Sequence, residues 1–336
     1  MSRSKPTPLP ASTIAQVGAA PVDTPAVRTV PPVNIRVITE GLRFPEGPVV
    51  MDDGSVIVVE MERETLSRCY MDGTVEVVAE VPGGPNGAAI GPDGACYVAN
   101  NGGFEWVRTP MGLMMPASPK NGYTGGSIDR VDLKTGKVTT LYDSAGGNRL
   151  SAPNDLMFDR NGGFWFTDFG KTVGRHTDRG SLCYGRADGS FVTEAVFPMI
   201  GPNGCGVSPD GKRVYVAEFP TGRLYGFDIT GEGTVSKQGG FLPGHLIAAP
   251  GGNTFWDSLA IEADGSVVIA CPQRGGLMRI TPDGRTIEHT PLDDFLTTNV
   301  AFGGPDMKTA YVTLTAAGRL IAIDWPRPGL KLPYTA

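Results

Sequence analysis

The sequence predicts an all-β protein and, within that class, a six-bladed β-propeller. Three observations lead to this prediction. A turn signature followed by an apolar strand occurs six times along the chain. The 47 glycines and 29 prolines follow no fixed period, which is typical of many tight turns between short strands. Apolar runs with helical spacing are absent.

The turn signature is Asp-Gly, Asn-Gly or a degenerate form of these dipeptides. Its six copies lie at residues 52–60, 92–100, 160–168, 209–218, 263–271 and 305–313. Asp-Gly and Asn-Gly favour two-residue hairpin turns, because both central positions of such a turn need a positive φ. Each copy therefore predicts a hairpin between two strands.

Two further strands are expected in most repeats. Third strands, often opened by glycine, are expected at 126–133, 222–229, 276–284 and 318–325, and fourth strands at 75–81 and 137–143. Four antiparallel strands form a propeller blade, and six blades close a ring. Residues 34–41 are expected to add the outer strand of the last blade and so close the circle. A β-sandwich, the alternative, offers no reason for six equal copies.

Residues 34–336 are therefore expected to form one propeller domain. Residues 1–33 are rich in Pro, Ala and Thr and predict an extended or disordered arm. The alternative is an arm that reaches a neighbouring subunit and supports a homo-oligomer. The widest interval between repeats, residues 101–125, contains several aromatic, Met and Leu side chains. Because long loops in compact domains are usually functional, we expect this insertion to be a lid over the channel mouth.

Composition excludes several classes of partner. The net charge is −6 and there is no basic run, so nucleic acid is not expected as a partner. No stretch approaches the roughly 20 apolar residues of a membrane span, and the N-terminal segment lacks the apolar run of a signal peptide. A cytoplasmic location is expected. The five cysteines are scattered and lack CxxC spacing, which predicts buried thiols without a disulfide framework or structural zinc.

One position in the repeat predicts a functional site. In every copy an acidic or amide residue lies eight positions before the turn glycine, or before Met307 in the sixth copy. These residues are Glu46, Asn86, Asn154, Asn203, Asp257 and Asn299. Strands disfavour Asn and Asp, and the innermost strands of a propeller line its channel, so a ring of side-chain oxygens is expected at one mouth. The alternative is that each residue caps its strand through an Asx-turn, which does not explain Glu46.

Such a ring suits a hard cation. Carboxylate and amide oxygens are the ligands that Ca²⁺ or Mg²⁺ prefers. The absence of histidine argues against a dedicated zinc site, although oxygen ligands also accept Mn²⁺ or Zn²⁺. We therefore expect one divalent cation, most simply Ca²⁺, in the central channel.

Five segments resemble one known family. They are FPEGPVV at 44–50, SAPNDLMFDRNGGFWFTD at 151–168, GPNGCGVSPDGKRVYVAE at 201–218, WDSLAIEADGSVVIAC at 256–271 and TTNVAFGG at 297–304. In order and spacing, over residues 35–325, the chain is similar to the senescence marker protein/gluconolactonase/luciferin-regenerating-enzyme family. The resemblance implies a six-bladed propeller with a buried divalent cation, and lactonase activity.

The resemblance also implies roles for particular residues. The family's metal ligands correspond by motif to Glu46, Asn203 and Asp257, and its asparagine facing substrate and metal water corresponds to Asn154. In the fifth blade the family more often has Pro-Asp-Gly, whereas this chain has Trp256-Asp257-Ser258. Trp256 is therefore expected to make the wall beside the metal bulkier and to contact substrate.

Lactone hydrolysis needs a polarised carbonyl and a base that activates water. Asp257 is the first candidate for the base and Glu46 the second. Asn86, Asn154 and Asn299 are expected to orient water or substrate oxygens. The three histidines have no GxSxG-type elbow near them, so a Ser-His-Asp triad is not supported.

The expected function is that of a metal-dependent lactonase, a carboxylic ester hydrolase of gluconolactonase type. The insertion suggests a small-molecule lactone with an apolar part, contacted by Trp106 and Met114. A phosphotriester or other ester hydrolase on the same scaffold is the first alternative. A calcium-binding propeller without enzymatic activity is the second.

Overall fold

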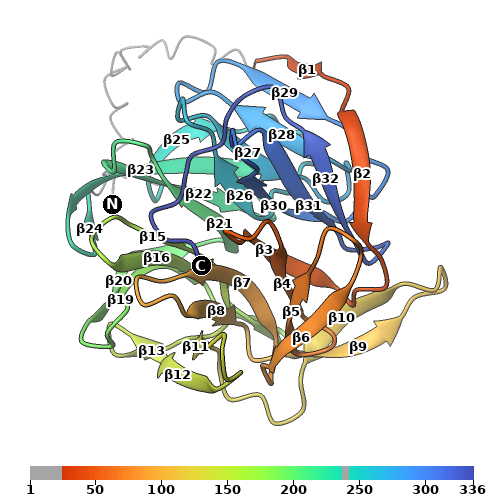
Figure 1. Cartoon of the computed structure of the whole chain (residues 1–336). Coiled ribbons are helices and arrows are strands. Elements are labelled where there is room, and N and C mark those ends of the chain that lie inside the picture. The colour runs from red at the N-terminus through yellow and green to blue at the C-terminus, as the bar shows by residue number, and fades with distance from the viewer. Residues whose placement is uncertain (1–24, 237–241) are drawn as a thin grey trace, which may run out of the picture.

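The computed structural model describes residues 25–236 and 242–336, and every regular element within them is a β-strand. The strands form six main sheets that stand around a common centre (Figure 1). The predicted all-β, six-bladed propeller is confirmed. Within the described residues, no helix is long and apolar enough to cross a membrane.

Blades 1 to 3 each contain four antiparallel strands. Blade 1 consists of β3 (Pro45–Val50), β4 (Val56–Glu60), β5 (Thr65–Cys69) and β6 (Val75–Glu80). Blade 2 consists of β7 (Pro85–Ile90), β8 (Cys96–Asn100), β11 (Ser127–Val131) and β12 (Val138–Tyr142). Blade 3 consists of β15 (Pro153–Phe158), β16 (Gly163–Asp168), β19 (Gly180–Arg186) and β20 (Val192–Met199).

Blades 4 to 6 repeat this plan with additions. Blade 4 consists of β21 (Pro202–Val207), β22 (Arg213–Glu218), β23 (Arg223–Gly231) and β25 (His245–Ala248), and β24 (Thr234–Val235) pairs with the end of β23. Blade 5 consists of β26 (Leu259–Ile261), β27 (Val267–Ala270), β28 (Leu277–Ile280) and β29 (Ile287–Thr290). Blade 6 consists of β30 (Thr297–Gly303), β31 (Thr309–Leu314), β32 (Arg319–Asp324) and β2 (Val33–Thr39).

Three short hairpins interrupt the repeats. They are β9 (Phe104–Arg108) with β10 (Met114–Pro119), β13 (Ser144–Ala145) with β14 (Asn148–Arg149), and β17 (Thr172–Val173) with β18 (His176–Thr177). The predicted insertion at 101–125 is therefore a β-hairpin flanked by loops. All three hairpins leave the propeller at the end where the innermost strands begin.

The six hairpin turns form where the signature predicts them, but they are not the expected two-residue turns. The Asp or Asn before each turn glycine is not among the residues with positive φ, and in the first turn Met51 N donates to Ser55 O across three residues. The five turn glycines, such as Gly54 and Gly162, have φ between 72° and 87°, the left-handed region that glycine adopts without steric cost. In the sixth copy Met307 takes the same conformation with φ 57°. The turn geometry is therefore kept even where glycine is replaced.

The ring closes through the two ends of the domain. Strand β2 pairs antiparallel with β32 on the outer edge of blade 6, so the predicted closing strand is confirmed. Of the predicted arm, residues 1–24 lie outside the described residues. Its end forms β1 (Val27–Thr29), which adds a parallel fifth strand to β29 of blade 5 within the same chain.

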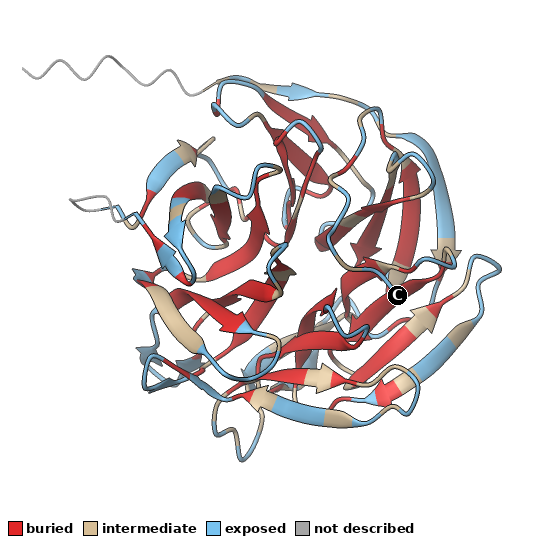
Figure 2. Cartoon of the chain, turned by 60° about the vertical axis from the view of Figure 1, so that its left-hand side comes forward, coloured by how far each residue is buried: buried red, intermediate tan, exposed pale blue. Residues whose placement is uncertain are grey.

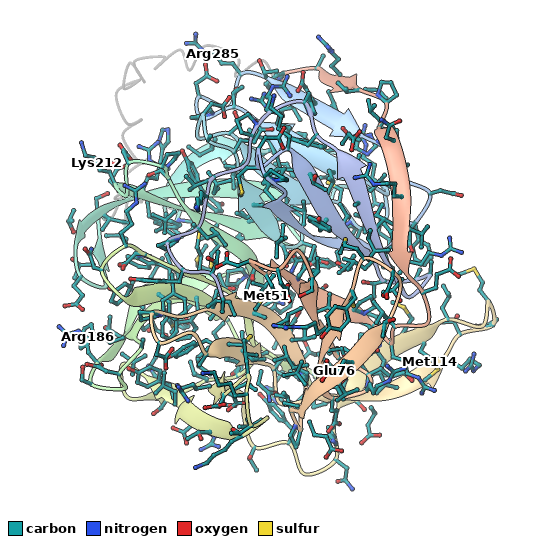
Figure 3. The ribbon with its side chains drawn as sticks, viewed as in Figure 1. Met51, Glu76, Met114, Arg186, Lys212 and Arg285 are labelled. Carbon is teal, nitrogen blue, oxygen red and sulfur yellow. The ribbon has the colours of Figure 1, made fainter. Side chains whose placement is uncertain are left out.

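Packing between neighbouring blades forms the core. In each blade the inner strands are mostly buried, and the fourth strand is more exposed except in blade 5, where β1 pairs with the buried β29 (Figure 2). Between blades 2 and 3, Phe158 contacts Tyr97 and Phe164 with ring centroids 5.0 and 5.1 Å apart. Met51 lies near the centre of the view, whereas Lys212 and Arg285 lie at the perimeter (Figure 3).

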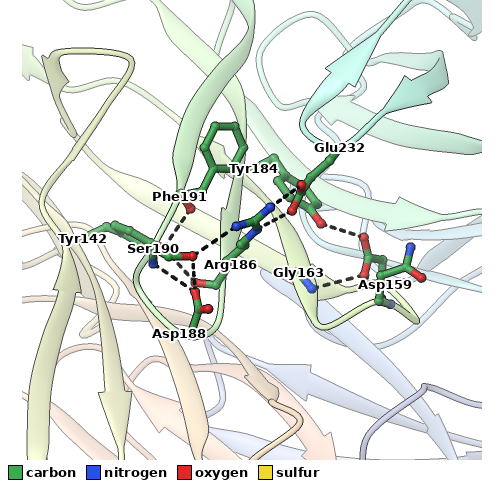
Figure 4. Close-up of polar contacts among 10 residues, drawn as sticks. Tyr142, Asp159, Gly163, Tyr184, Arg186, Asp188, Ser190, Phe191 and Glu232 are labelled. Atoms are coloured by element: carbon green, nitrogen blue, oxygen red, sulfur yellow. Dashed lines mark hydrogen bonds and ion pairs between the residues drawn. The ribbon is translucent and has the colours of Figure 1, made fainter.

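Polar contacts at the perimeter join blades 2, 3 and 4 (Figure 4). The Arg186 guanidinium donates to both carboxylate oxygens of Glu232 at 2.6 and 2.7 Å. The Tyr142 hydroxyl donates to the Arg186 and Phe191 carbonyl oxygens, both at 2.8 Å. Exposed ion pairs contribute only about 0.2–1 kcal/mol each. The buried apolar interfaces therefore contribute most of the stability that holds the blades together.

Candidate functional site

The six residues predicted from the repeat come together at one end of the channel. The first strands of consecutive blades, β3, β7, β15, β21, β26 and β30, contact one another around the centre. Each predicted residue lies at the start of one of these strands, or two residues before it in blade 5. All six side chains are buried, with 3% to 8% of each residue exposed. We call them the oxygen ring.

A β-bulge or a similar irregularity lies beside most of these residues. The pairing register of the innermost strand shifts at the oxygen-ring position in five blades, for example between Glu46 and Val49 and between Pro153 and Leu156. A bulge leaves one residue unpaired and turns its side chain away from the regular alternation. Asn299 does not form the Asx-turn of the alternative, because its Oδ1 accepts from the amide of the next residue, Val300, at 2.7 Å and not from the residue after it. The same side chain also donates from Nδ2 to Glu46 Oε2 at 3.0 Å, so it acts across blades.

Close backbone contacts join neighbouring blades at the oxygen ring. Gly204 N donates to Asp257 O at 3.2 Å, and Ser258 N donates to Thr298 O at 3.2 Å. Thr167 Oγ1 donates to Asn203 O at 2.6 Å. A Cβ on Gly47 would lie 2.7 Å from Asn86 O, and one on Gly87 would lie 2.5 Å from Asn154 O. Together with the Asn299–Glu46 bond, these contacts run through all six blades.

The glycine contact between blades 2 and 3 gives a test of the ring. In Gly87→Ala the new methyl group would overlap the Asn154 carbonyl, so the backbone of Asn154 and Asp155 must move. We expect metal affinity to fall about tenfold, with the blades still folded. Calorimetric titration measures it. Gly231→Ala is the control, because its methyl group would meet only the Thr234 hydroxyl at an exposed edge. If Gly87→Ala leaves the metal affinity unchanged, the close approach of Gly87 to the Asn154 carbonyl does not matter for the ring.

Three carboxyl groups at the site repel one another. Burial raises the pKa of Glu46 to about 7, although hydrogen bonds from Asn299, Thr298 and Gly47 oppose the shift. Burial and then the charge of Glu46 raise the pKa of Asp257 well above its usual range. Burial and the charge of Glu46 also raise the pKa of Asp155 to about 7. Among the described residues, no Lys, Arg or His forms an ion pair with any of the three.

One buried acceptor has no hydrogen-bond donor. Asn154 Oδ1 is the only buried side-chain oxygen in the described part of the chain without a partner. Leaving such an atom unsatisfied costs about 1–3 kcal/mol, and an ion or water is the usual partner. Uncompensated carboxylates beside an orphaned amide oxygen fit a divalent cation. The described residues contain no group of three His, Cys, Asp or Glu side chains arranged to hold a metal, so a ligand set here would need amide oxygens such as that of Asn203.

Asp155 was not among the residues predicted from the sequence. It follows Asn154 on β15, is buried, and its Oδ1 accepts from the Leu156 amide at 3.0 Å. The repeat does contain a signal for it: blades 1, 2 and 4 have glycine at the equivalent position. A carboxylate in place of glycine beside the ring marks a third acidic group in the channel.

The prediction for Trp256 is wrong. Its side chain is 0% exposed and packs in the apolar core around Leu259 and Ile269. Its Nε1 points toward Met278 Sδ at 3.3 Å. The residue before Asp257 therefore faces the core of blade 5, because adjacent residues of an extended chain point to opposite sides.

The hairpin of β9 and β10 is fixed at its base to blades 1 and 3. Trp106 contacts Phe44, two residues before Glu46, with ring centroids 5.0 Å apart. Lys171 of blade 3 donates to the carbonyls of Asn101 and Gly103 at 2.8 and 3.0 Å and lies 3.4 Å above the Phe104 ring. Met114 lies half-buried on β10 (Figure 3), while the tip residue Met111 is 76% exposed. These contacts place the hairpin at the mouth where the oxygen ring lies.

The opposite end of the channel is crossed by the C-terminal segment (Figure 2). A cavity of about 640 Å³ extends from Asp155 and Asn299 to residues 330–335. Tyr334 packs against Phe158 with ring centroids 5.7 Å apart, and Ala336 O accepts from the Asp52 amide at 3.1 Å.

The fold and the oxygen ring define a six-bladed propeller with an acidic, amide-lined site at one mouth. Residues 44–316 match the SMP-30/gluconolactonase/LRE-like region, so the chain belongs to that family. A gluconolactonase of Zymomonas mobilis is 25% identical over 75% of this chain and 71% of its own length. A 6-deoxy-6-sulfogluconolactonase of Pseudomonas putida is 27% identical over 56% of this chain and 63% of its own length.

A solved structure shares the same fold. The calcium-binding protein regucalcin of Agrobacterium tumefaciens superposes with a TM-score of 0.64 at 20% identity, covering 91% of this chain and 100% of its own.

Proposed function

We propose that this protein is a divalent-metal-dependent lactonase that hydrolyses a lactone with an apolar part. The observation that carries the proposal is the oxygen ring, in which Glu46 and Asp257 repel each other beside the unpartnered oxygen of Asn154. Relatives named as lactonases support the same chemistry.

Glu46, Asn203 and Asp257 would hold the cation. All three supply oxygen ligands, which favours Ca²⁺, with Mg²⁺, Mn²⁺ or Zn²⁺ as alternatives. The description of the structurally similar regucalcin as calcium-binding makes Ca²⁺ the first cation to test. A divalent cation held there would polarise the lactone carbonyl and increase the acidity of a water molecule.

The chain's own residues would direct the hydrolysis. Asp257, or Glu46 in its place, accepts a proton from the attacking water. Water adds to the lactone carbonyl carbon, the ring C–O bond breaks, and the proton passes to the released alkoxide to give a hydroxy acid. Asn86, Asn154 and Asn299 orient the water and the substrate oxygens through their amide groups.

A substrate panel tests this proposal. The Ca²⁺-loaded protein is assayed on sugar lactones, alkyl lactones and a phosphotriester, with and without chelator. We expect lactone hydrolysis that stops with chelator and returns with added cation. Turnover of the phosphotriester alone would favour the alternative hydrolase. Stoichiometric metal binding without any turnover would favour a calcium-binding propeller.

The hairpin gives a further prediction. Trp106 and Met114 are half-buried at the mouth, and full burial of such a side chain by a bound substrate is worth about 1.5–3 kcal/mol. Replacing residues 105–118 by a short Gly-Ser turn should therefore raise KM about tenfold or more for alkyl lactones and only slightly for small polar ones. Metal affinity should not change, because the proposed ligands lie on the innermost strands or, for Asp257, two residues before one.

The control for the hairpin replacement is Met111→Ala, since Met111 is exposed at the hairpin tip. This substitution should leave KM for both lactones unchanged. Equal losses on alkyl and polar lactones in the hairpin-deleted protein would show that the hairpin is not a substrate lid.

A further inference from the structure

Three phenylalanine side chains form a continuous aromatic surface on blades 3 to 5. The ring centroids of Phe169 and Phe219 are 6.0 Å apart, and those of Phe219 and Phe255 are 5.2 Å apart. All three side chains are only partly buried, unlike the fully buried aromatic residues between the blades. We call Phe169, Phe219 and Phe255 the phenylalanine wall.

Backbone hydrogen bonds place this wall beside the oxygen ring. Phe169 N donates to Ala152 O, two residues before Asn154, at 2.9 Å. Phe219 N donates to Gly201 O, two residues before Asn203, at 2.9 Å. Both phenylalanines directly follow the second strand of their blade, which ends at the mouth where the innermost strand begins.

Phe255 and Gly201 complete the placement. Phe255 lies two residues before Asp257, and Phe219 O accepts from Trp256 N at 3.3 Å. A Cβ on Gly201 would lie 3.1 Å from the Phe169 ring, so this glycine lets the ring approach the segment that leads to Asn203. The wall thus borders the side of the mouth that presents Asn203 and Asp257.

A second aromatic pair lies across the mouth. Phe44, two residues before Glu46, contacts Trp106 of the hairpin. Its φ of 54° is rare for a bulky side chain, and such backbone strain concentrates at functional sites. Blade 1 lies opposite blade 4 in a six-bladed ring. The acidic centre is therefore flanked by aromatic side chains on two opposite sides.

We infer that the phenylalanine wall binds an aryl or extended alkyl substituent of the lactone, with Phe219 as the specificity-determining residue. Phe219 is central because it contacts both other members of the wall. Aromatic side chains at a partly open site favour apolar and aryl groups through burial and offset or edge contacts. This inference rests on the proposed lactonase function and narrows its substrate class, independently of the hairpin.

The first test compares the hydrolysis of two lactones. The Phe219→Ala and Phe219→Leu variants are assayed on γ-phenyl-γ-butyrolactone and on unsubstituted γ-butyrolactone. We expect Phe219→Ala to lower kcat/KM about tenfold to a hundredfold for the aryl lactone, chiefly through KM, and less than about threefold for the unsubstituted one. Phe219→Leu should recover part of the loss. Phe191 lies at the far end of blade 3, and Phe191→Ala should leave kcat/KM unchanged for both lactones.

Binding of the phenyl-substituted γ-lactam, which resists hydrolysis, separates the two proposals. Calorimetry should show weaker lactam binding in Phe219→Ala at unchanged metal content and melting temperature. If neither lactone is hydrolysed while the lactam still binds in a Phe219-dependent manner, the lactonase proposal fails and the wall stands. If Phe219→Ala changes lactam binding not at all, or lowers kcat/KM equally for both lactones, the wall is not a specificity element.

Discussion

Asp257→Asn should lower kcat/KM for lactone hydrolysis by about a thousandfold or more. The substitution keeps the side-chain shape, removes one of the two carboxylates proposed to hold the cation, and removes the first candidate for the base. Loss of a positioned base alone typically costs about 10²–10⁴ in rate. Steady-state assays with metal content measured in parallel separate the two effects.

Glu46→Gln tests the other carboxylate. It should weaken cation binding sharply, because the amide keeps the contact with Asn299 but loses the negative charge. If activity returns at high cation concentration, Glu46 acts as a ligand and Asp257 is the base. Asp283→Asn, an exposed aspartate on the turn between β28 and β29, is the matched control and should behave as wild type. Full rate and full metal occupancy in both site variants would make the ring structural only.

The second large effect is a pH-dependent stabilisation by cation. Burial raises the pKa of Glu46 and of Asp155 to about 7, above their ordinary values of 4.5 and 3.8. Because these pKa values are higher in the folded than in the unfolded protein, the protonated carboxyl groups contribute fully to the stability of the metal-free fold below about pH 4. This contribution to stability is lost as the pH rises through about 7. The metal-free protein should become less stable between these limits.

A bound cation should reverse this trend, because it compensates the ionised carboxylates. The gain in melting temperature on adding saturating Ca²⁺ should thus be larger at pH 8 than at pH 5. Scanning calorimetry at both values measures the gain, and Glu46→Gln should reduce its dependence on pH. Glu76→Gln, which changes an exposed residue of blade 1, should leave the dependence as in wild type. A gain that is larger at pH 5 would contradict the assignment.

The regular part of the architecture could be predicted because the repeat signals are local. Each hairpin depends on a dipeptide whose backbone preference is intrinsic, and even Met307 follows the pattern with φ 57°. The offset of eight residues located the oxygen ring because the number of residues between the mouth and the hairpin turn is the same in every blade, although the paired strands differ in length. Burial of all six residues at one mouth follows from that regularity.

Features that depend on contacts between blades could not be predicted in the same way. Trp256 is expected at the mouth because it precedes Asp257, but it packs in the core that blades 4 and 5 form together. Phe169, Phe219 and Phe255 are separated by long stretches of sequence, and only the packed blades bring them together. Asp155 has no counterpart of the same type in the other repeats, and only the packing of the blades around the channel brings it near Glu46.

Calorimetric titration of the metal-free protein with Ca²⁺ at pH 8 tests the central claim most directly. The oxygen ring predicts one high-affinity site per chain in the wild type, and none in the Asp257→Asn, Glu46→Gln double variant. Lactone hydrolysis should rise in parallel with occupancy of that site. A wild-type protein that binds no cation, or a double variant that still binds one equivalent with unchanged affinity, would contradict the assignment of the oxygen ring.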